Sequence, residues 1–155
     1  MTVLPIAELK PALAPGARLL GLDVGTKTIG LAISDSGLRV ATPVETIGRG
    51  KFATDAARLK KVIDGRGVGG LVIGLPLNMN GSEGPRCQSV RQFTANLLGQ
   101  FDIAIAFWDE RLSTAAVERA MIAADVSRSR RVKAIDENAA AYILQGALDA
   151  LGRAA

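Results

Sequence analysis

The chain has 155 residues, 48% of them hydrophobic, which is enough for one domain with a substantial core. Its formal net charge of +4 is compatible with a nucleic-acid or other phosphate partner. The absence of histidine excludes Ser-His-Asp and Cys-His nucleophilic enzymes, histidine acid–base catalysis and the usual zinc sites. A single cysteine cannot form an internal disulfide, so we expect a reducing, cytoplasmic environment, and no apolar run approaches the roughly 20 residues of a membrane span.

Residues 1–17 are expected to form a flexible N-terminal tail. Met1–Pro15 contains three prolines and lacks the basic segment and apolar stretch of a signal peptide. Residues 18–151 contain no repeat and no linker, so we expect them to form a single domain.

The stretch Gly21–Asp35 predicts a β-hairpin with a charged residue inside its first strand. Leu19, Leu20 and Leu22 form an apolar run that contains Asp23, residues 24–27 form the turn, and residues 29–34 form the returning strand. Because an unpaired charge in a buried strand is unfavourable, Asp23 should face a metal ion or an ion bound to phosphate.

The rest of the chain predicts alternating helices and strands. Apolar spacing and turn residues indicate, in order, an edge-like strand over Val40–Ile47 interrupted by Pro43, a helix over Phe52–Ile63, a buried strand over Leu71–Gly74, a polar loop over Asn78–Pro85, a helix from Cys87 to about Gly99, a strand over Ile103–Trp108, a helix from Ser113 or Thr114 to Ala123, a basic loop or helix start over Ser127–Lys133, and a helix over Ile135–Leu151. Antiparallel strands followed by alternating strands and helices favour a three-layer α/β domain with a mixed sheet.

Three acidic positions are expected to meet in this architecture. Asp23 lies on the first strand, Glu110 or its neighbour Asp109 ends the last strand, and Asp136 lies near the start of the last helix. Converging carboxylates imply bound cations or raised pKa values. Without imidazole or thiolate ligands, oxygen-only coordination favours Mg²⁺ or Mn²⁺, and such ions suit in-line hydrolysis of a phosphodiester.

Each acidic residue also has a purely structural interpretation. Asp136 could cap the last helix, and Asp109 or Glu110 could pair with Arg111 at the surface. The cations Arg128, Arg130, Arg131 and Lys133 could form a solvated face or neutralise phosphates beside the site. Cys87, Phe93, Phe107 and Tyr142 are expected in the core, so nucleic-acid contacts should go mainly to the backbone.

Four stretches together resemble the YqgF family. They are Gly-Leu-Asp-Val-Gly-Thr-Lys-Thr-Ile-Gly-Leu-Ala-Ile-Ser-Asp (21–35), Val-Ile-Gly-Leu-Pro-Leu-Asn-Met-Asn-Gly (72–81), Asp-Glu-Arg-Leu-Ser-Thr (109–114) and Ile-Asp-Glu-Asn-Ala-Ala-Ala-Tyr-Ile-Leu-Gln (135–145). The family is also called RuvX-like and is related to the Holliday-junction resolvase RuvC. The resemblance runs from about Arg18 to Leu151, and the four motifs are in the family's order.

The resemblance implies a ribonuclease H-like fold, with a mixed five-stranded sheet flanked by helices, and a metal-dependent nuclease. It implies a role in maturing the 5′ end of pre-16S rRNA, with branched DNA as an alternative substrate, and it admits a homodimer. Carried over by motif, Asp23, Glu110 and Asp136 would be the catalytic residues and the ligands of Mg²⁺ or Mn²⁺. The residues expected to contact nucleic acid are Lys27, Asn78, Arg111, Arg128, Arg130, Arg131 and Lys133.

Two other functions compete with the nuclease. The Asp-Val-Gly-Thr turn also resembles the first phosphate loop of sugar kinases, actin and Hsp70-type ATPases, but those proteins need two such halves and this chain has one. The second alternative is a basic, non-catalytic domain that binds ribosomal RNA or a ribosome-assembly partner, with its acids serving structure.

Overall fold

The computed structural model describes residues 3–153, except the side chains of residues 114–116, 118, 135 and 136. The helices are α1 (Ile6–Leu9), η1 (Lys10–Ala12), α2 (Phe52–Gly65), α3 (Pro85–Leu98), α4 (Glu110–Ala123), α5 (Arg128–Glu137) and α6 (Ala139–Arg153), and the strands are β1 (Arg18–Val24), β2 (Thr28–Ser34), β3 (Ala41–Gly48), β4 (Val68–Leu75) and β5 (Ala104–Asp109). In this part of the chain, no helix is both long enough and apolar enough to cross a membrane.

The strands form one mixed sheet in the order β3-β2-β1-β4-β5. β1 pairs antiparallel with β2, and β2 pairs antiparallel with β3. β1 pairs parallel with β4, and β4 pairs parallel with β5. The predicted mixed sheet is therefore confirmed, and β1, β3, β4 and β5 all end at the same edge of it.

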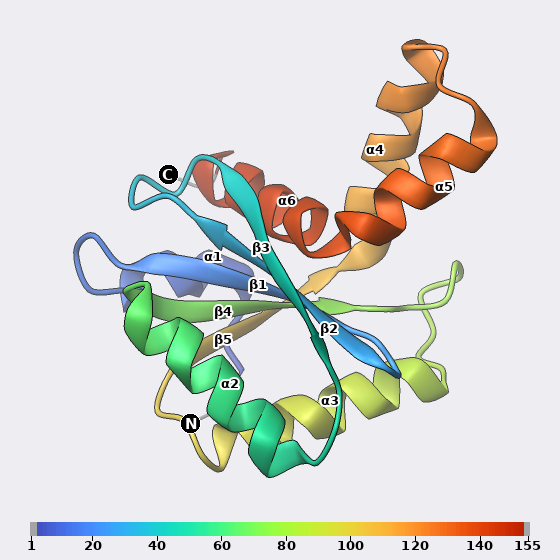
Figure 1. Cartoon of the computed structure of the whole chain (residues 1–155). Helices are drawn as coiled ribbons and strands as arrows, with labels where there is room; N and C mark the ends of the chain where they lie inside the picture. Colours follow the sequence, from blue (N-terminus) through green and yellow to red (C-terminus); the bar gives the residue numbers. More distant parts are fainter. Residues whose placement is uncertain (1–2, 154–155) are drawn as a thin grey trace.

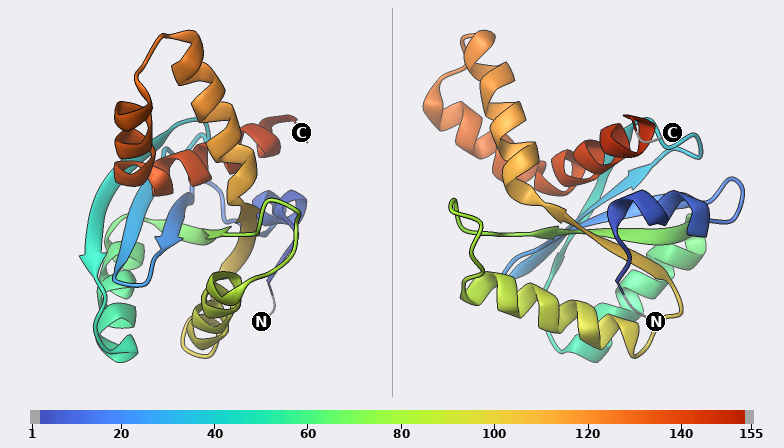
Figure 2. Two further views of the ribbon diagram at one scale, coloured as in Figure 1. Left: turned by 90° about the vertical axis from the view of Figure 1, so that its right-hand side faces the viewer. Right: turned by 180° about the vertical axis from the view of Figure 1, so that it is seen from behind.

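Helices cover both faces of this sheet, as the three-layer prediction required (Figure 1). α2 and α3 lie on one face, where Leu20, Leu59, Ile73 and Leu97 are fully buried in one core cluster. α6 and α1 lie on the other face over a second cluster that includes Leu144. α4 and α5 form an arm that projects away from these layers (Figure 2).

α6 packs directly against the backbone of β1. A Cβ added to Gly21 would lie 2.7 Å from Cβ of Leu144 and 3.0 Å from the carbonyl oxygen of Ala140, so only glycine allows this approach. The close packing fixes the start of α6 beside the strand that carries Asp23.

The segment before β1 packs onto the sheet. Leu4 forms a parallel bridge with Ala106, and its backbone N–H donates to the carbonyl of Ile105 over 2.8 Å. Leu9 of α1 is fully buried. From Val3 onward, the segment expected as a flexible tail is therefore held along β5, because its alternating apolar residues reach the second core cluster.

Two helix boundaries differ from the sequence predictions. α4 begins at Glu110 with Asp109 as its N-cap, not at Ser113 or Thr114, because the Asp109 carboxylate accepts the backbone N–H of Arg111. The helix predicted over Ile135–Leu151 is two helices that meet at Asn138, so the backbone of Asp136 lies in the last turn of α5 and not at the start of the final helix.

The edge strand β3 is irregular at the predicted proline. Glu45 is paired with Leu31 and Pro43 with Ala32, so Val44 is left over as a bulge between them. A proline lacks a backbone donor and is tolerated at such an edge position.

Candidate active site

Asp23 lies at the sheet edge where the parallel strands end. It is the second-last residue of β1, it is paired with Gly30 of β2, and it is partly buried. A Cβ on Gly30 would lie 3.6 Å from the Cβ atoms of both Asp23 and Ala140, so the absence of a side chain there leaves room around the carboxylate. Carboxyl ends of strands are where open α/β sheets place functional groups.

Glu110 reaches the same place from the other side of β4. It directly follows β5 and is partly buried. Burial, and then the negative charge of Asp23, raise the pKa of Glu110 from 4.5 to about 7, whereas Arg86 acts in the opposite direction. Asp23 and Glu110 are therefore close enough for the charge of one carboxylate to act on the other.

Gly74 of β4 makes room for this glutamate. A Cβ at that position would lie 2.6 Å from Oε1 of Glu110 and 2.5 Å from Cδ1 of Ile143. A side chain on β4 would therefore displace Glu110 or α6. Gly74 belongs to the site by steric necessity, although it carries no functional group.

Asp109 has a structural role, which resolves the alternative between it and Glu110. Its carboxylate caps α4 and forms an ion pair with Arg111, with 2.7 Å between Oδ2 of Asp109 and Nη2 of Arg111. The hydrogen bond from the Arg111 side chain is the main cause that lowers the pKa of Asp109. The predicted surface pair is thus confirmed for Asp109 and not for Glu110.

A small pocket beside Asp23 includes the junction of α5 and α6. It has a volume of about 150 Å³, and Asp23, Glu137, Asn138 and Ala140 are among the residues that line it. Asp136 directly precedes two of these residues, but its side chain lies outside the described part of the structure. Among the side chains that are described, no group of three Asp, Glu or Cys residues could hold a metal ion.

Arg111 ties the polar loop after β4 to the end of β5. Its Nη1 donates to the carbonyl of Met79 over 3.1 Å and to that of Asn78 over 3.4 Å, while the other nitrogens of its guanidinium bind Asp109. Within the loop, Nδ2 of Asn78 donates to Oγ of Ser82. Asn78 and Arg111 therefore meet beside the site, and they do so through the backbone oxygen of Asn78.

Comparison with known proteins identifies the family. The family model described as "RuvX: Holliday junction resolvase" matches residues 17–150. The chain belongs to the RuvX family. Curated relatives carry the name "Putative pre-16S rRNA nuclease". One from Paramagnetospirillum magneticum is 59% identical over 149 residues, and the alignment covers 96% of this chain and 96% of the relative. Another, from Roseobacter denitrificans, is 60% identical over 146 residues, which are 92% of this chain and 89% of the relative.

Solved structures show that the RuvX chain shares its fold with Holliday-junction resolvases. Thermus thermophilus RuvC, solved with a Holliday-junction substrate, aligns with a TM-score of 0.56 at 13% identity over 86% of this chain and 94% of that one. The yeast mitochondrial resolvase Ydc2 also gives 0.56, at 11% identity over 96% of this chain and 85% of that one. The ribonuclease H-like fold implied by the sequence motifs is thereby confirmed.

The predicted nucleic-acid-binding cations of this RuvX chain lie in two separate places. Lys27 is exposed in the β1–β2 turn, next to the acids. Arg128, Arg130, Arg131 and Lys133 all lie on α5, which belongs to the projecting arm (Figure 2). Lys133 lies 3.8 Å from Glu137, and Nη1 of Arg131 donates to the carbonyl of Val126, so part of this charge has local partners.

Sequence reasoning missed Gly74 and Arg86 at this site. A lone glycine in an apolar strand, or an arginine at the start of a helix, gives no local signal of its neighbours in space. Only Pro85, which starts α3 directly after the polar loop, could have indicated that Arg86 begins a helix close to the site.

Proposed function

We propose that this chain is an endonuclease that depends on Mg²⁺ or Mn²⁺ and hydrolyses phosphodiester bonds. The observation that carries the proposal is the interaction of Asp23 with Glu110, two acids from distant parts of the chain that meet at the end of the sheet. An isolated pair of partly buried carboxylates is unfavourable unless a cation or a proton compensates it. The family and fold of the chain support the same activity.

The residues present fit a divalent cation with oxygen ligands. Asp23 and Glu110 supply hard oxygen donors, and the negative charge of Asp23 is, after burial, the second cause that raises the pKa of Glu110 to about 7. Asp136 would complete the set from the last turn of α5. When bound, such ions supply activation of the attacking water and stabilisation of the leaving oxygen.

The chain's own residues would position the substrate around these acids. Arg111 holds the loop that contains Asn78 at the edge of the site, so the loop can form one wall of the substrate path. Lys27 and the cations of α5 would attract backbone phosphates, which gives affinity without base specificity.

The substrate we propose is pre-16S rRNA, as the names of the curated relatives suggest, and its 5′ region is what the family resemblance implies. With this substrate the protein would act in the cytoplasm. Branched DNA is the second candidate, because the family model is described as a Holliday junction resolvase. A homodimer remains an expectation from the family resemblance.

The decisive test is cleavage by the purified full chain. We expect the protein to cut an RNA that spans the 5′ end of 16S rRNA in Mg²⁺ or Mn²⁺ and not in EDTA, with a synthetic four-way DNA junction assayed in parallel. Asp23→Asn should abolish cutting while circular dichroism and RNA binding are retained. Cutting that survives this substitution or EDTA would overturn the catalytic assignment, and binding without cutting by the wild type would favour the non-catalytic ribosome-assembly role.

A further inference from the structure

Two arginines bind the turn that follows Asp23. Nη1 of Arg49 donates to the carbonyl of Gly25 over 2.6 Å, and Nη2 of Arg86 donates to the carbonyl of Val24 over 3.4 Å. Arg49 directly follows β3, and Arg86 lies in the first turn of α3. Because β3 ends at the same edge as β1, Arg49 reaches the β1–β2 turn from the end of β3. Arg86 reaches the same turn from the start of α3.

In the described part of the chain, neither arginine forms a close ion pair with a carboxylate. Arginines on α2, α3 and α4 do have acidic partners in the described part of the chain: Arg58 with Glu45 at 3.9 Å, Arg91 with Glu83 at 2.6 Å, and Arg111 with Asp109 at 2.7 Å. A neutral carbonyl occupies one N–H of a guanidinium, which leaves its charge and most of its five donors for another partner.

Both side chains are held, yet they remain accessible. The guanidinium of Arg49 lies 5.2 Å from the centre of the Phe93 ring, a stacking contact that limits its motion, and this side chain is only partly buried. Arg86 is exposed, and it lies close enough to the acids for its charge to oppose the rise in the pKa of Glu110. Both arginines therefore flank the turn after Asp23 on the α3 side of the sheet, and the charge of Arg86 acts on Glu110.

We propose that Arg49 and Arg86 form a phosphate-binding subsite for a backbone phosphate next to the one that is cleaved. The planar donor fork of arginine matches phosphate oxygens. Since α5 carries its cations on the arm, above the α6 face, and this pair lies toward α3, the substrate strand would run between them across the acids (Figure 1). The subsite rests on the proposed nuclease function, which it deepens.

The test measures RNA binding as a function of salt. The probe is a fluorescein-labelled RNA hairpin with a single-stranded 5′ extension, followed by anisotropy in Mg²⁺, with Asp23→Asn in every protein to keep the RNA intact. We expect Arg49→Gln with Arg86→Gln to weaken binding about 10-fold and to reduce the slope of log K against log salt by about 1 to 2. Arg58→Gln, which removes one exposed arginine of α2, is the control and should change neither.

Further variants separate a substrate contact from a structural role. The double Lys variant keeps both charges and should restore the salt slope. In the otherwise wild-type protein, the double Gln variant should raise KM more than it lowers kcat. A double Gln variant that melts like the wild type and binds like Arg58→Gln would overturn the subsite. If the double variant melts at a lower temperature than the wild type, the single variant Arg86→Gln is used instead, because the Arg86 side chain is exposed and its loss should not disturb the fold. An unchanged slope of log K against log salt in this single variant refutes the subsite.

Failure of the subsite and failure of the nuclease proposal give different results. If the protein without these substitutions binds the hairpin but never cuts RNA, the nuclease function fails while anisotropy still tests the subsite. If it does not bind the hairpin, both fail. If it binds and cuts, and only the arginine variants are unaffected, the subsite alone fails.

Discussion

Glu110 is held where its ionised form is unfavourable. In an unfolded chain its carboxyl would ionise near pH 4.5, whereas burial and the charge of Asp23 keep it protonated to about pH 7 in the fold. Between these two pH values the unfolded chain releases a proton that the folded chain keeps. The free energy of unfolding therefore falls as the pH rises from 4.5 to 7, and then levels off.

Replacing Glu110 by Gln should stabilise the metal-free protein at pH 8. The pKa shift from 4.5 to about 7 corresponds to roughly 3 kcal/mol, so we expect a gain of about 2 kcal/mol in the free energy of unfolding, which is roughly 5 °C in Tm. At pH 4 the gain should vanish, because the carboxyl is then protonated in both states. Thermal melts in EDTA at the two pH values provide the measurement.

The matched control is Asp109→Asn, which should have the opposite sign. Arg111 lowers the pKa of Asp109, so the ionised carboxylate stabilises the fold above its unfolded pKa. Its loss should lower the Tm at pH 8. If both variants lower the Tm equally, the raised pKa of Glu110 is refuted.

Gly74→Ala should disable the site although it replaces no functional side chain. The new Cβ would meet Oε1 of Glu110 at 2.6 Å and Cδ1 of Ile143 at 2.5 Å, so one of them must move. We expect cleavage to fall at least 10-fold and stability to fall by about 1–3 kcal/mol, the usual range for overpacking. Gly65→Ala, where nothing lies within 4 Å of the added Cβ, should leave both unchanged in the same cleavage and urea-unfolding assays.

At the scale of elements, the loop after β4 depends on one side chain. Arg111 bridges Asp109 and the carbonyls of Asn78 and Met79, and Met79 is 90% exposed. Arg111→Gln should therefore speed amide hydrogen exchange across residues 78–84, with little change in β1 or α2. Exchange measured by mass spectrometry tests this, and unchanged protection of the loop would show that its internal turn suffices.

The contact between β5, α4 and α6 also depends on a single side-chain interaction, the hydrogen bond between Trp108 and Ser113. Nε1 of Trp108 donates to Oγ of Ser113 over 2.7 Å, both side chains are buried, and a Cβ on Gly146 would clash with Ser113 and lie 2.8 Å from Nε1 of Trp108. Ser113→Ala leaves the indole N–H without its acceptor, so we expect a loss of about 1–3 kcal/mol by urea unfolding. In the background Trp108→Phe the same substitution should cost much less, which isolates the hydrogen bond.

Patterns along the chain predicted the strands better than the helix ends. Apolar runs predicted β1, β2, β4 and β5, since burial selects such runs, whereas β3 was predicted as an edge strand interrupted by Pro43 and is largely exposed. The break at Asn138 was missed because no Gly or Pro interrupts the helical spacing across it. The residue types of Ser113 and Thr114 suit a helix cap, but the hydroxyl of Ser113 instead accepts a hydrogen bond from Nε1 of Trp108.

The site was predictable in part for the same reason. Asp23 stood out because a charge inside a buried strand needs an explanation, and Glu110 because it follows the last strand. The choice between Glu110 and Asp109 depended on the ion pair that Asp109 makes with Arg111. The roles of Gly74 and Arg86 depend on neighbours far away in sequence, which no local pattern encodes.

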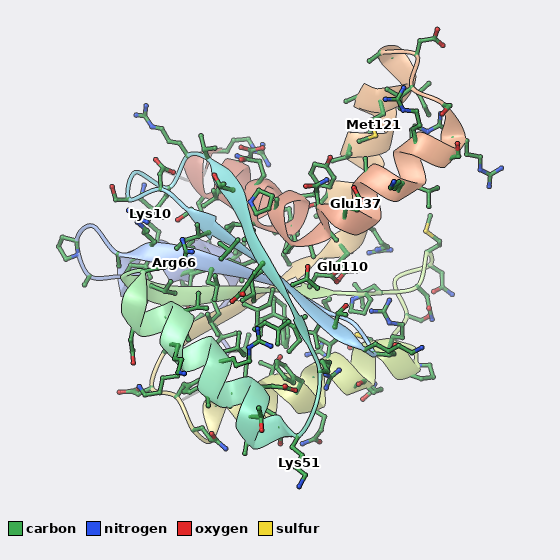
Figure 3. All side chains as sticks on the ribbon, viewed as in Figure 1. Lys10, Lys51, Arg66, Glu110, Met121 and Glu137 are labelled. Atoms are coloured by element: carbon green, nitrogen blue, oxygen red, sulfur yellow. The ribbon has the colours of Figure 1, made fainter. Side chains whose placement is uncertain are left out.

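At the scale of the whole molecule, the pattern of positive charge should set the salt dependence of binding. The arm carries Arg128 and Arg130 exposed on α5, away from the sheet. Arg128→Gln with Arg130→Gln should weaken binding of unrelated RNA hairpins by similar factors, because contacts to phosphates carry no sequence information. Lys10 and Arg66 lie well apart from Glu110, toward the left of Figure 3, so neutralising them serves as the control and should leave affinity unchanged.

Both borders of the sheet are closed to a further strand. On one side, Pro43, the bulge at Val44 and the charged Glu45 interrupt β3, and on the other side Leu4 already occupies the backbone of β5. These features disfavour the pairing of two copies edge to edge into one continuous sheet, and for the same reason they disfavour growth of the sheet by addition of strands from other chains.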